Sequence, residues 1–132
     1  MEISKWKKRR LTPTWGGNDE EPEPCVIVFA PPPVGWMARW RELAVTAPSF
    51  DADSMSEEGY LEKVTAWSGS IQSFRDELIE DLVLDVEGLT LGGKAVSRAE
   101  GLAFILDNEG LREEVFLAVI AEGTLTVSEG KD

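Results

Sequence analysis

One stretch of the sequence resembles the start of a phosphate-binding loop. Gly88 and Gly93 are separated by four residues, and Lys94 follows directly, as in a P-loop. In that loop, backbone N–H groups and the lysine ammonium hold phosphate oxygens, and a hydroxyl at the next position binds Mg²⁺. The next residue here is Ala95, which has no hydroxyl. A β-hairpin that turns at Gly92-Gly93 explains these glycines with fewer assumptions.

Paired carboxylates are a second chemical signal. Such a pair performs glycosidase-type acid–base chemistry only where one carboxyl group is removed from water in a cleft. We expect most of these pairs to lie on the polar faces of helices or in loops, where carboxylates stay solvated. The pairs and triplets are Asp19/Glu20/Glu21, Asp51/Asp53, Glu57/Glu58, Asp76/Glu77, Glu80/Asp81 and Glu113/Glu114.

The segment from Asp51 to Ser56 loosely follows the start of a calcium-binding loop. Glu62 stands at the twelfth position of such a loop if counting starts at Asp51, but Ser56 then replaces the central glycine that the turn needs. Calcium loops depend on both features, so we expect no calcium site here.

The chain has one cysteine and no histidine. Without histidine there is no Ser-His-Asp or Cys-His machinery and no imidazole metal ligand. Cys25 opens an apolar run, so we interpret it as a small core hydrophobe rather than a nucleophile. The sequence therefore predicts a protein that is not an enzyme and that has no metal or other cofactor.

Charge is distributed unevenly along the 132 residues. The net charge is −12, but residues 1–10 alone sum to +4, so the remaining residues sum to −16. An acidic body disfavours nucleic acid as a partner. No apolar run approaches the ~18–20 residues of a membrane span, and no apolar stretch of a secretory signal follows the basic start. We expect a soluble protein of a reducing compartment.

Hydrophobic periodicity predicts helices over 34–45, 56–83, 98–107 and 109–122. The strongest pattern is an apolar stripe with alternating four- and three-residue steps, opened by a capping box at Ser54–Glu57. A second capping box, Ser97–Glu100, opens the third helix, and Gly123 is a natural C-cap for the last one. The stripe consists of Tyr60, Val64, Trp67, Ile71, Phe74, Leu78 and Leu82.

The β content is expected to be small. A β-branched run over 25–30 predicts a strand, and the segment 83–96 predicts a hairpin. Residues 13–24 are rich in proline, glycine and acid, which favours an irregular linker. We therefore predict a mainly α fold with minor β (α+β), in which a leader and linker over 1–24 precede one globular domain over 25–132.

The tryptophans are the candidate contact residues. Trp6 and Trp15 lie in the polar leader. Such large rings are stabilising only where they are covered, so we expect them to dock on this domain or on a partner. Trp36 and Trp40 share one face of the helix over 34–45, where a core role is the alternative. We predict a partner-binding surface in the N-terminal half that includes Trp6, Trp15, Trp36 and Trp40.

The order of these segments resembles a known family. The pieces that carry the likeness are the leader Ile3-Ser4-Lys5-Trp6-Lys7-Lys8, the segment Trp15-Gly16-Gly17-Asn18, and the block from Leu84 to Ile120 with Val86-Glu87-Gly88-Leu89. Together they are similar to the tail assembly chaperones of long-tailed bacteriophages and prophages. The resemblance covers most of the chain.

The resemblance implies a non-enzymatic role. Members of that family bind the tape measure protein and help the tail tube protein to polymerise around it, and they are absent from the finished virion. We therefore expect the cytoplasm of a bacterial host as the location, with self-association left open. Two other classes also remain open: a virion structural protein of the head–tail connector or tail terminator type, and an acidic DNA mimic that binds a host protein.

Overall fold

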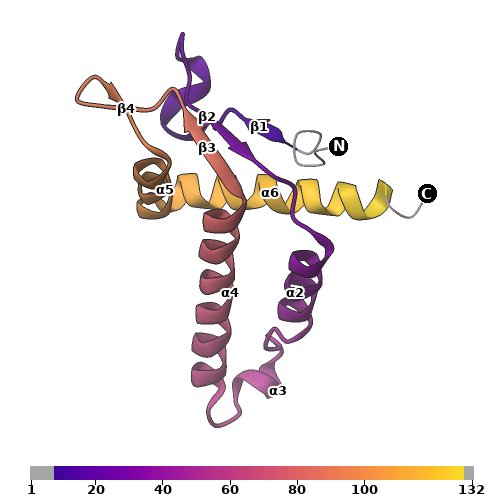
Figure 1. The fold of residues 1–132 in the computed structure, drawn as a ribbon. Coiled ribbons are helices and arrows are strands. Elements are labelled where there is room, and N and C mark those ends of the chain that lie inside the picture. Colours follow the sequence, from indigo (N-terminus) through magenta and orange to yellow (C-terminus); the bar gives the residue numbers. More distant parts are fainter. Residues whose placement is uncertain (1–7, 130–132) are drawn as a thin grey trace.

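A computed structural model describes residues 8–129, with the side chains of the last helix described as far as residue 124. The chain contains short strands and longer helices, and the fold is mainly α with a minor β part, as predicted (Figure 1). In chain order the elements are β1 (Arg9–Leu11), a 3-10 helix η1 (Trp15–Glu20), β2 (Val26–Phe29), α2 (Val34–Val45), α3 (Ala52–Met55), α4 (Tyr60–Leu82), β3 (Val83–Glu87), β4 (Thr90–Leu91), β5 (Lys94–Ala95), α5 (Arg98–Asp107) and α6 (Glu109–Glu129).

The body of the protein is a small antiparallel sheet covered by helices. The strand order is β1-β2-β3, with Ile27 of β2 opposite Val86 of β3. Helices α5 and α6 pack against this sheet, and Ile27, Val86 and Ile105 lie in one buried apolar cluster with the inner face of α6. Burial of this many aliphatic side chains is the main source of stability for a domain of this size.

Two helices extend away from the body. In Figure 1, α6 runs across the upper ends of α2 and α4, which continue side by side below it, with α3 at their far end. We call residues 34–82 the arm and residues 45–61 its tip. The buried side chains of α4 are Phe74, Leu78, Ile79 and Leu82, all in its C-terminal half. The other half of α4 therefore stands outside the body.

The structure corrects two predicted helices. The helix expected over 56–83 is shorter in the structure. It begins as α4 at Tyr60, because Gly59 adopts a left-handed φ of 81° just before it, and it ends at Leu82, because Val83 is already in a strand. The expected Ser54–Glu57 cap is also wrong, since the Asp51 carboxylate accepts the Ser54 N–H and caps α3. The helices over 34–45 and 98–107 are confirmed.

The last helix is longer than predicted. Helix α6 continues through Gly123 to Glu129, so Gly123 is not a C-cap. A Cβ at position 123 would collide with Met37 Sδ and Pro32 Cγ. The glycine is needed because the start of α2 and the residues before it approach α6 closely at this point, which is a packing reason rather than a helix-ending one.

The strand prediction at 25–30 is confirmed as β2, and the hairpin over 83–96 needs refinement. Its first part, β3, pairs with β2 instead of folding back on the following strand. The hairpin itself is β4–β5, in which Leu91 pairs with Lys94 and both Gly92 and Gly93 have positive φ. That geometry is a two-residue primed turn, as the glycine pair indicated.

The described part of the segment 1–24 contains regular structure. Strand β1 joins the sheet next to β2, and Arg9 makes an ion pair of 2.9 Å with Glu122 of α6. The helix η1 occupies half of the expected irregular linker, and its glycines Gly16 and Gly17 both have positive φ. These residues pack against the domain that follows them.

Gly101 provides a test of the packing between α5 and the sheet. A Cβ at this position would lie 2.7 Å from Val86 Cβ, so Gly101→Ala should lower the free energy of unfolding by about 1–3 kcal/mol. Gly35→Ala in α2 is the matched control, because its Cβ meets nothing within 4 Å. Urea denaturation followed by circular dichroism measures both. Equal effects of the two substitutions would contradict this packing.

Candidate functional site

The base of the arm is an aromatic cluster centred on Phe74 of α4. The Phe74 ring is 1% exposed and is stacked on Trp40 of α2, with ring centroids 5.7 Å apart. Trp36 meets the same ring edge-on at 5.6 Å, and Phe116 of α6 contacts both Trp40 and Phe74. These four rings fix α2 against α4 and α6, since aromatic pairs of this geometry add to the area that they bury.

Further out, single hydrogen bonds join α4 to the last turn of α2 and to the loop that follows α2. The Trp67 indole N–H donates to the Leu43 carbonyl oxygen at 2.9 Å. At the tip, the Tyr60 hydroxyl donates to the Ser49 carbonyl oxygen, also at 2.9 Å. Helix α4 thus contacts α2 at the base and again at Leu43, and at the tip it contacts the loop that follows α2.

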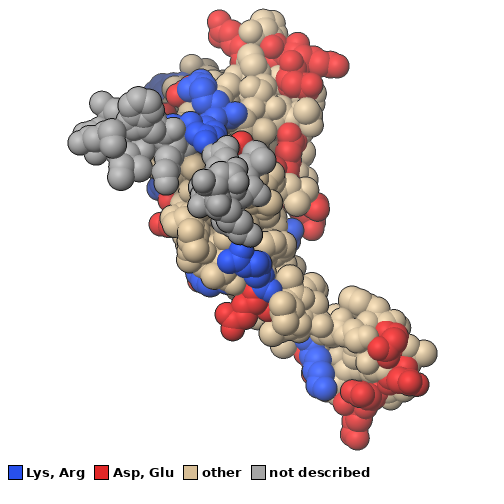
Figure 2. Space-filling model, turned by 90° about the vertical axis from the view of Figure 1, so that its right-hand side faces the viewer, with Lys and Arg blue, Asp and Glu red and all other residues tan. Residues whose placement is uncertain are grey.

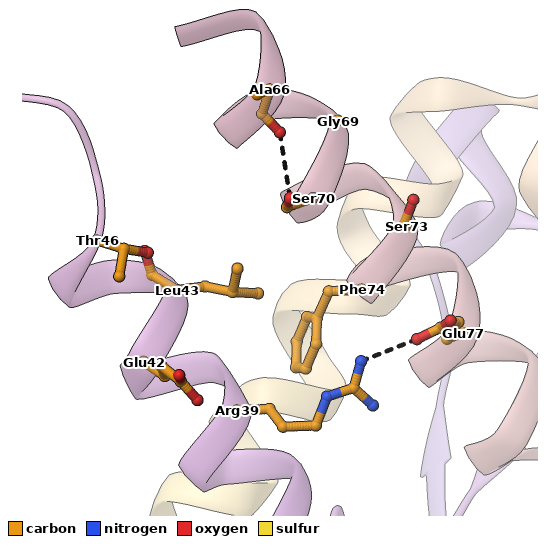
Figure 3. Close-up of a pocket in the computed structure, with 10 residues that line it drawn as sticks. All are labelled: Arg39, Glu42, Leu43, Thr46, Ala66, Gly69, Ser70, Ser73, Phe74 and Glu77. Carbon is orange, nitrogen blue, oxygen red and sulfur yellow. Dashed lines mark hydrogen bonds and ion pairs between the residues drawn. The ribbon is translucent and has the colours of Figure 1, made fainter. Parts of the chain in front are cut away.

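An open groove of about 620 Å³ lies between α2 and α4. Figure 3 shows its two walls, with Leu43 and Arg39 on the α2 side and Phe74 at its base. The α4 wall is made of small residues on one helical face, so this wall is low. They are Ala66, Gly69, Ser70 and Ser73.

Arg39 lies across the lower end of the groove. Its guanidinium carbon is 4.7 Å from the centroid of the Trp36 ring and 5.4 Å from that of Phe74. Its Nη2 donates to Glu77 Oε2 at 2.9 Å, the ion pair drawn in Figure 3. A cation held over aromatic rings and paired with a carboxylate is therefore already part of this site.

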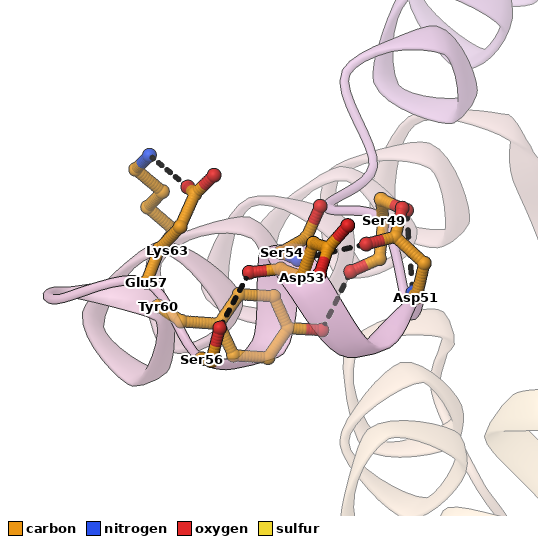
Figure 4. Close-up of polar contacts among 8 residues, drawn as sticks. All are labelled: Ser49, Asp51, Asp53, Ser54, Ser56, Glu57, Tyr60 and Lys63. Atoms are coloured by element: carbon orange, nitrogen blue, oxygen red, sulfur yellow. Dashed lines mark hydrogen bonds and ion pairs between the residues drawn. The ribbon is translucent and has the colours of Figure 1, made fainter.

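The tip is acidic and is ordered by local caps. Asp51 accepts hydrogen bonds from the Ser49 hydroxyl and the Ser54 N–H, and these bonds lower the pKa of its carboxyl group (Figure 4). Lys63 lies 4.0 Å from Glu57, both largely exposed. The tip contains four acidic and no basic residues, a net charge of −4. Figure 2 shows red acidic side chains around the far end of the arm.

Large apolar side chains are exposed among these acids. Phe50 is 69% exposed, Leu61 78% and Val45 85%, and Met55 is also exposed. We call these four the apolar tip residues. Sequence reasoning missed them, although Phe50 in an acidic loop and Leu61 outside the apolar stripe were visible signals. Several exposed apolar side chains on one projection mark a protein-binding site more often than isolated ones do.

The structure separates the predicted tryptophans. Trp6 lies outside the described residues. Trp36 and Trp40 are brought together, half-buried on Phe74. Trp15 is elsewhere, in η1, where it meets Phe104 of α5 edge-on at 5.7 Å. The partner role of these four residues stays a prediction.

The segment Trp15-Gly16-Gly17-Asn18 has a structural role. The Asn18 amide donates to the carbonyl oxygens of Pro13 and Cys25, and its oxygen accepts the Cys25 N–H at 2.8 Å. These bonds tie η1 to the start of β2. Cys25 lines a small apolar pocket beside Trp15, and partial burial raises the pKa of its thiol. A raised pKa disfavours the reactive thiolate.

The remaining chemical signals form no site in the described part of the chain. Lys94 belongs to the β4–β5 hairpin, and no helix follows it before α5. The carboxylates of Asp76 and Glu114 serve packing, since Asp76 lies 3.7 Å from Arg112 and Glu114 accepts the backbone N–H groups of Thr14 and Trp15. Among residues 8–129, no cluster of three or more His, Cys, Asp or Glu is placed to hold a metal.

Comparison with known proteins adds no relatives. No protein-family model matches this chain, and no curated protein or solved structure matches it either. Within the described residues, every helix is too short or too polar to cross a bilayer.

A substitution at Gly69 tests whether side chains of this protein occupy the groove. A Cβ at this position meets nothing within 4 Å, so Gly69→Ala should raise the free energy of unfolding by about 0.5–1 kcal/mol, the gain for alanine over glycine inside a helix. Gly59→Ala is the contrast, because φ is +81° there and the substitution should destabilise the fold. Thermal unfolding compares the two. A loss of stability in Gly69→Ala would show that the chain itself fills the groove.

Proposed function

We propose that this protein is a tail assembly chaperone of a long-tailed bacteriophage or prophage. It acts by holding the tape measure and tail tube proteins before assembly, and it carries out no chemical reaction. The observation that carries the proposal is the arm, which stands out from the body and bears the apolar tip residues among acidic side chains. The resemblance of the leader and of the block from Leu84 to Ile120 supplies the family.

Exposed apolar side chains favour binding to another apolar surface. Removing such surface from water is worth ~25 cal/mol per Å², so covering Phe50 and Leu61 with a partner is favourable. These two side chains are mostly in water in the chain on its own. A tape measure protein is long and helical and exposes apolar faces before assembly, so it is a suitable partner for such a tip.

The acidic charge fits the same role. A chaperone must remain soluble while its partner is covered, and a net charge well away from zero opposes aggregation. The tip has a net charge of −4 beside its apolar residues, so charge and contact surface occupy the same place. A complex formed there keeps its solubilising charge next to the newly covered surface.

The tip can be tested by co-expression with the neighbouring tape measure and tail tube proteins. We expect the wild-type chain to keep the tape measure protein soluble and to co-purify with it. The double substitution Phe50→Ser and Leu61→Ser should reduce the amount recovered by about tenfold or more, because it removes the exposed anchors. Its unfolding midpoint should stay close to wild type, since both side chains are exposed.

The matched control is Leu117→Ser on α6, a body residue that is 56% exposed. It should retain the partner in full. If the tip variant and this control recover equal amounts of the tape measure protein, the tip is not the contact surface. Failure of the wild-type chain to bind or solubilise either neighbouring protein would refute the proposed function itself.

A chaperone leaves the particle, whereas a connector or terminator stays in it. We therefore expect mass spectrometry of purified virions to detect the tail tube and tape measure proteins but not this chain. The infected-cell lysate serves as the positive control for its detection. Stoichiometric recovery of the chain in the particle would favour a virion structural protein instead.

A further inference from the structure

We propose that the groove between α2 and α4 binds an amphipathic helix with a basic face, supplied by the protein partner. This proposal rests on the proposed function, because the helix is supplied by a protein that the chaperone binds. The groove is separate from the apolar tip residues, and it is lined by small residues of α4 on one side and by α2 on the other.

The shape of the groove suits a helix. Helices pack 8–10 Å apart, and small side chains at the contact allow the closer end of that range. The α4 wall offers Ala66, Gly69, Ser70 and Ser73 at steps of three, one and three residues, so they form a flat strip along one face. A third helix laid along this strip would direct its apolar side chains toward Leu43 and Phe74.

Gly69 leaves the α4 wall of the groove open to a partner. It lies inside a 23-residue helix, where glycine costs ~1 kcal/mol relative to alanine. The other constrained helix glycines have an internal reason, because a Cβ at Gly101 or Gly123 would collide with side chains of the body. At Gly69 a Cβ would meet nothing within 4 Å. The described chain therefore supplies no internal reason for this glycine.

The charge around the groove selects a basic helix. Glu42 lines the groove from α2, and within residues 8–129 its carboxylate has no ion-pair partner. Glu80 and Asp81 lie at the body end, beside Trp36 and Glu77. The tip, with its net charge of −4, lies at the other end. A helix that spans the groove therefore meets carboxylates near both ends and Glu42 between them, while the cation of Arg39 is already paired with Glu77.

The same charge disfavours a second copy of this chain as the occupant. The arm holds ten acidic and four basic residues, a net charge of −6, so two arms packed face to face would repel each other. Arg39 shows the type of contact that the site accepts, since its guanidinium lies over the Trp36 ring and pairs with Glu77. Lysine or arginine of a partner helix can pair in the same way with Glu42.

The test uses the full chain and two synthetic helices of about 18 residues, or five turns. Both have leucine and alanine on one face, and the other face is lysine in the first helix and glutamate in the second. Isothermal titration calorimetry should show binding of the lysine helix at a Kd of about 10 μM or tighter and at least tenfold weaker binding of the glutamate helix. Equal binding of the two helices, or no binding of either, would overturn the proposal.

A groove variant separates binding in the groove from general attraction to an acidic protein. Gly69→Leu leaves the charge unchanged, fills the groove and suits a helix, so it should fold and weaken the lysine helix by about tenfold or more. Gly69→Ala, which adds one methyl group, should bind within about threefold of wild type. Undiminished binding of the lysine helix to Gly69→Leu would overturn the proposal.

A pair of charge reversals tests the electrostatic part. Glu42→Lys in the groove should weaken the lysine helix by about tenfold or more, whereas Glu20→Lys should change it by less than about twofold. Glu20 is exposed at the end of η1, which packs against α6 in the body, and its substitution changes the net charge equally. Equal effects of both substitutions would refute a specific role for Glu42.

This test and the test of the proposed function have separate outcomes. Binding of the lysine helix without any interaction with the tape measure or tail tube protein would support the groove and refute the chaperone role. Co-purification of the tape measure protein with Gly69→Leu and Glu42→Lys at wild-type levels would support the chaperone role and refute the groove as its contact.

Discussion

The arm depends on one contact, the stacking of α2 on the Phe74 ring. That ring is 1% exposed, and it is enclosed by Trp36 and Trp40 from α2 and by Phe116 from α6. Three helices distant in sequence therefore meet at one side chain. The direction in which α2 leaves the body follows from this cluster, and the walls of the groove are the continuations of α2 and α4 beyond it (Figure 3).

Stability along α4 decreases from the base of the arm to its tip. Residues Phe74, Leu78, Ile79 and Leu82 are buried, whereas the part of α4 that precedes Phe74 has no buried side chain. The tip depends on caps and single hydrogen bonds, such as those of Asp51 and Tyr60, rather than on buried side chains. Binding segments belong to the less stable end of a fold, because a partner can then complete their packing.

Local patterns in the sequence predicted most elements, and contacts between distant elements explain what those patterns missed. The stripe from Tyr60 to Leu82 predicted a helix, because apolar side chains on a helix repeat with its turn, but only its last members, Phe74, Leu78 and Leu82, are buried. The true start of α4 was missed because Ser54–Glu57 has the pattern of a capping box, whereas the chain uses Asp51 to cap the short α3 and begins α4 only after the left-handed turn at Gly59. Gly123 was misread because a helix-ending glycine and a close-packing glycine are alike in sequence.

Trp36 and Trp40 were correctly placed on one helix face, but their neighbours Phe74 and Phe116 come from elsewhere in the chain. The groove could not be predicted, since it exists only once those rings have set α2 beside α4.

Charge and shape act together in the arm. An apolar tip on a neutral projection would favour self-association, because like copies would cover each other's exposed side chains. The carboxylates of the tip and of α2 and α4 oppose that pairing, so the apolar surface remains available. The same carboxylates attract a basic partner over a distance of about a Debye length, roughly 8–10 Å at physiological salt. In the proposed complex, one set of side chains would therefore oppose pairing of copies and attract the basic partner. A helix that is basic on one face and apolar on the other satisfies the small-residue wall, the aromatic base and the acidic ends of the groove at once.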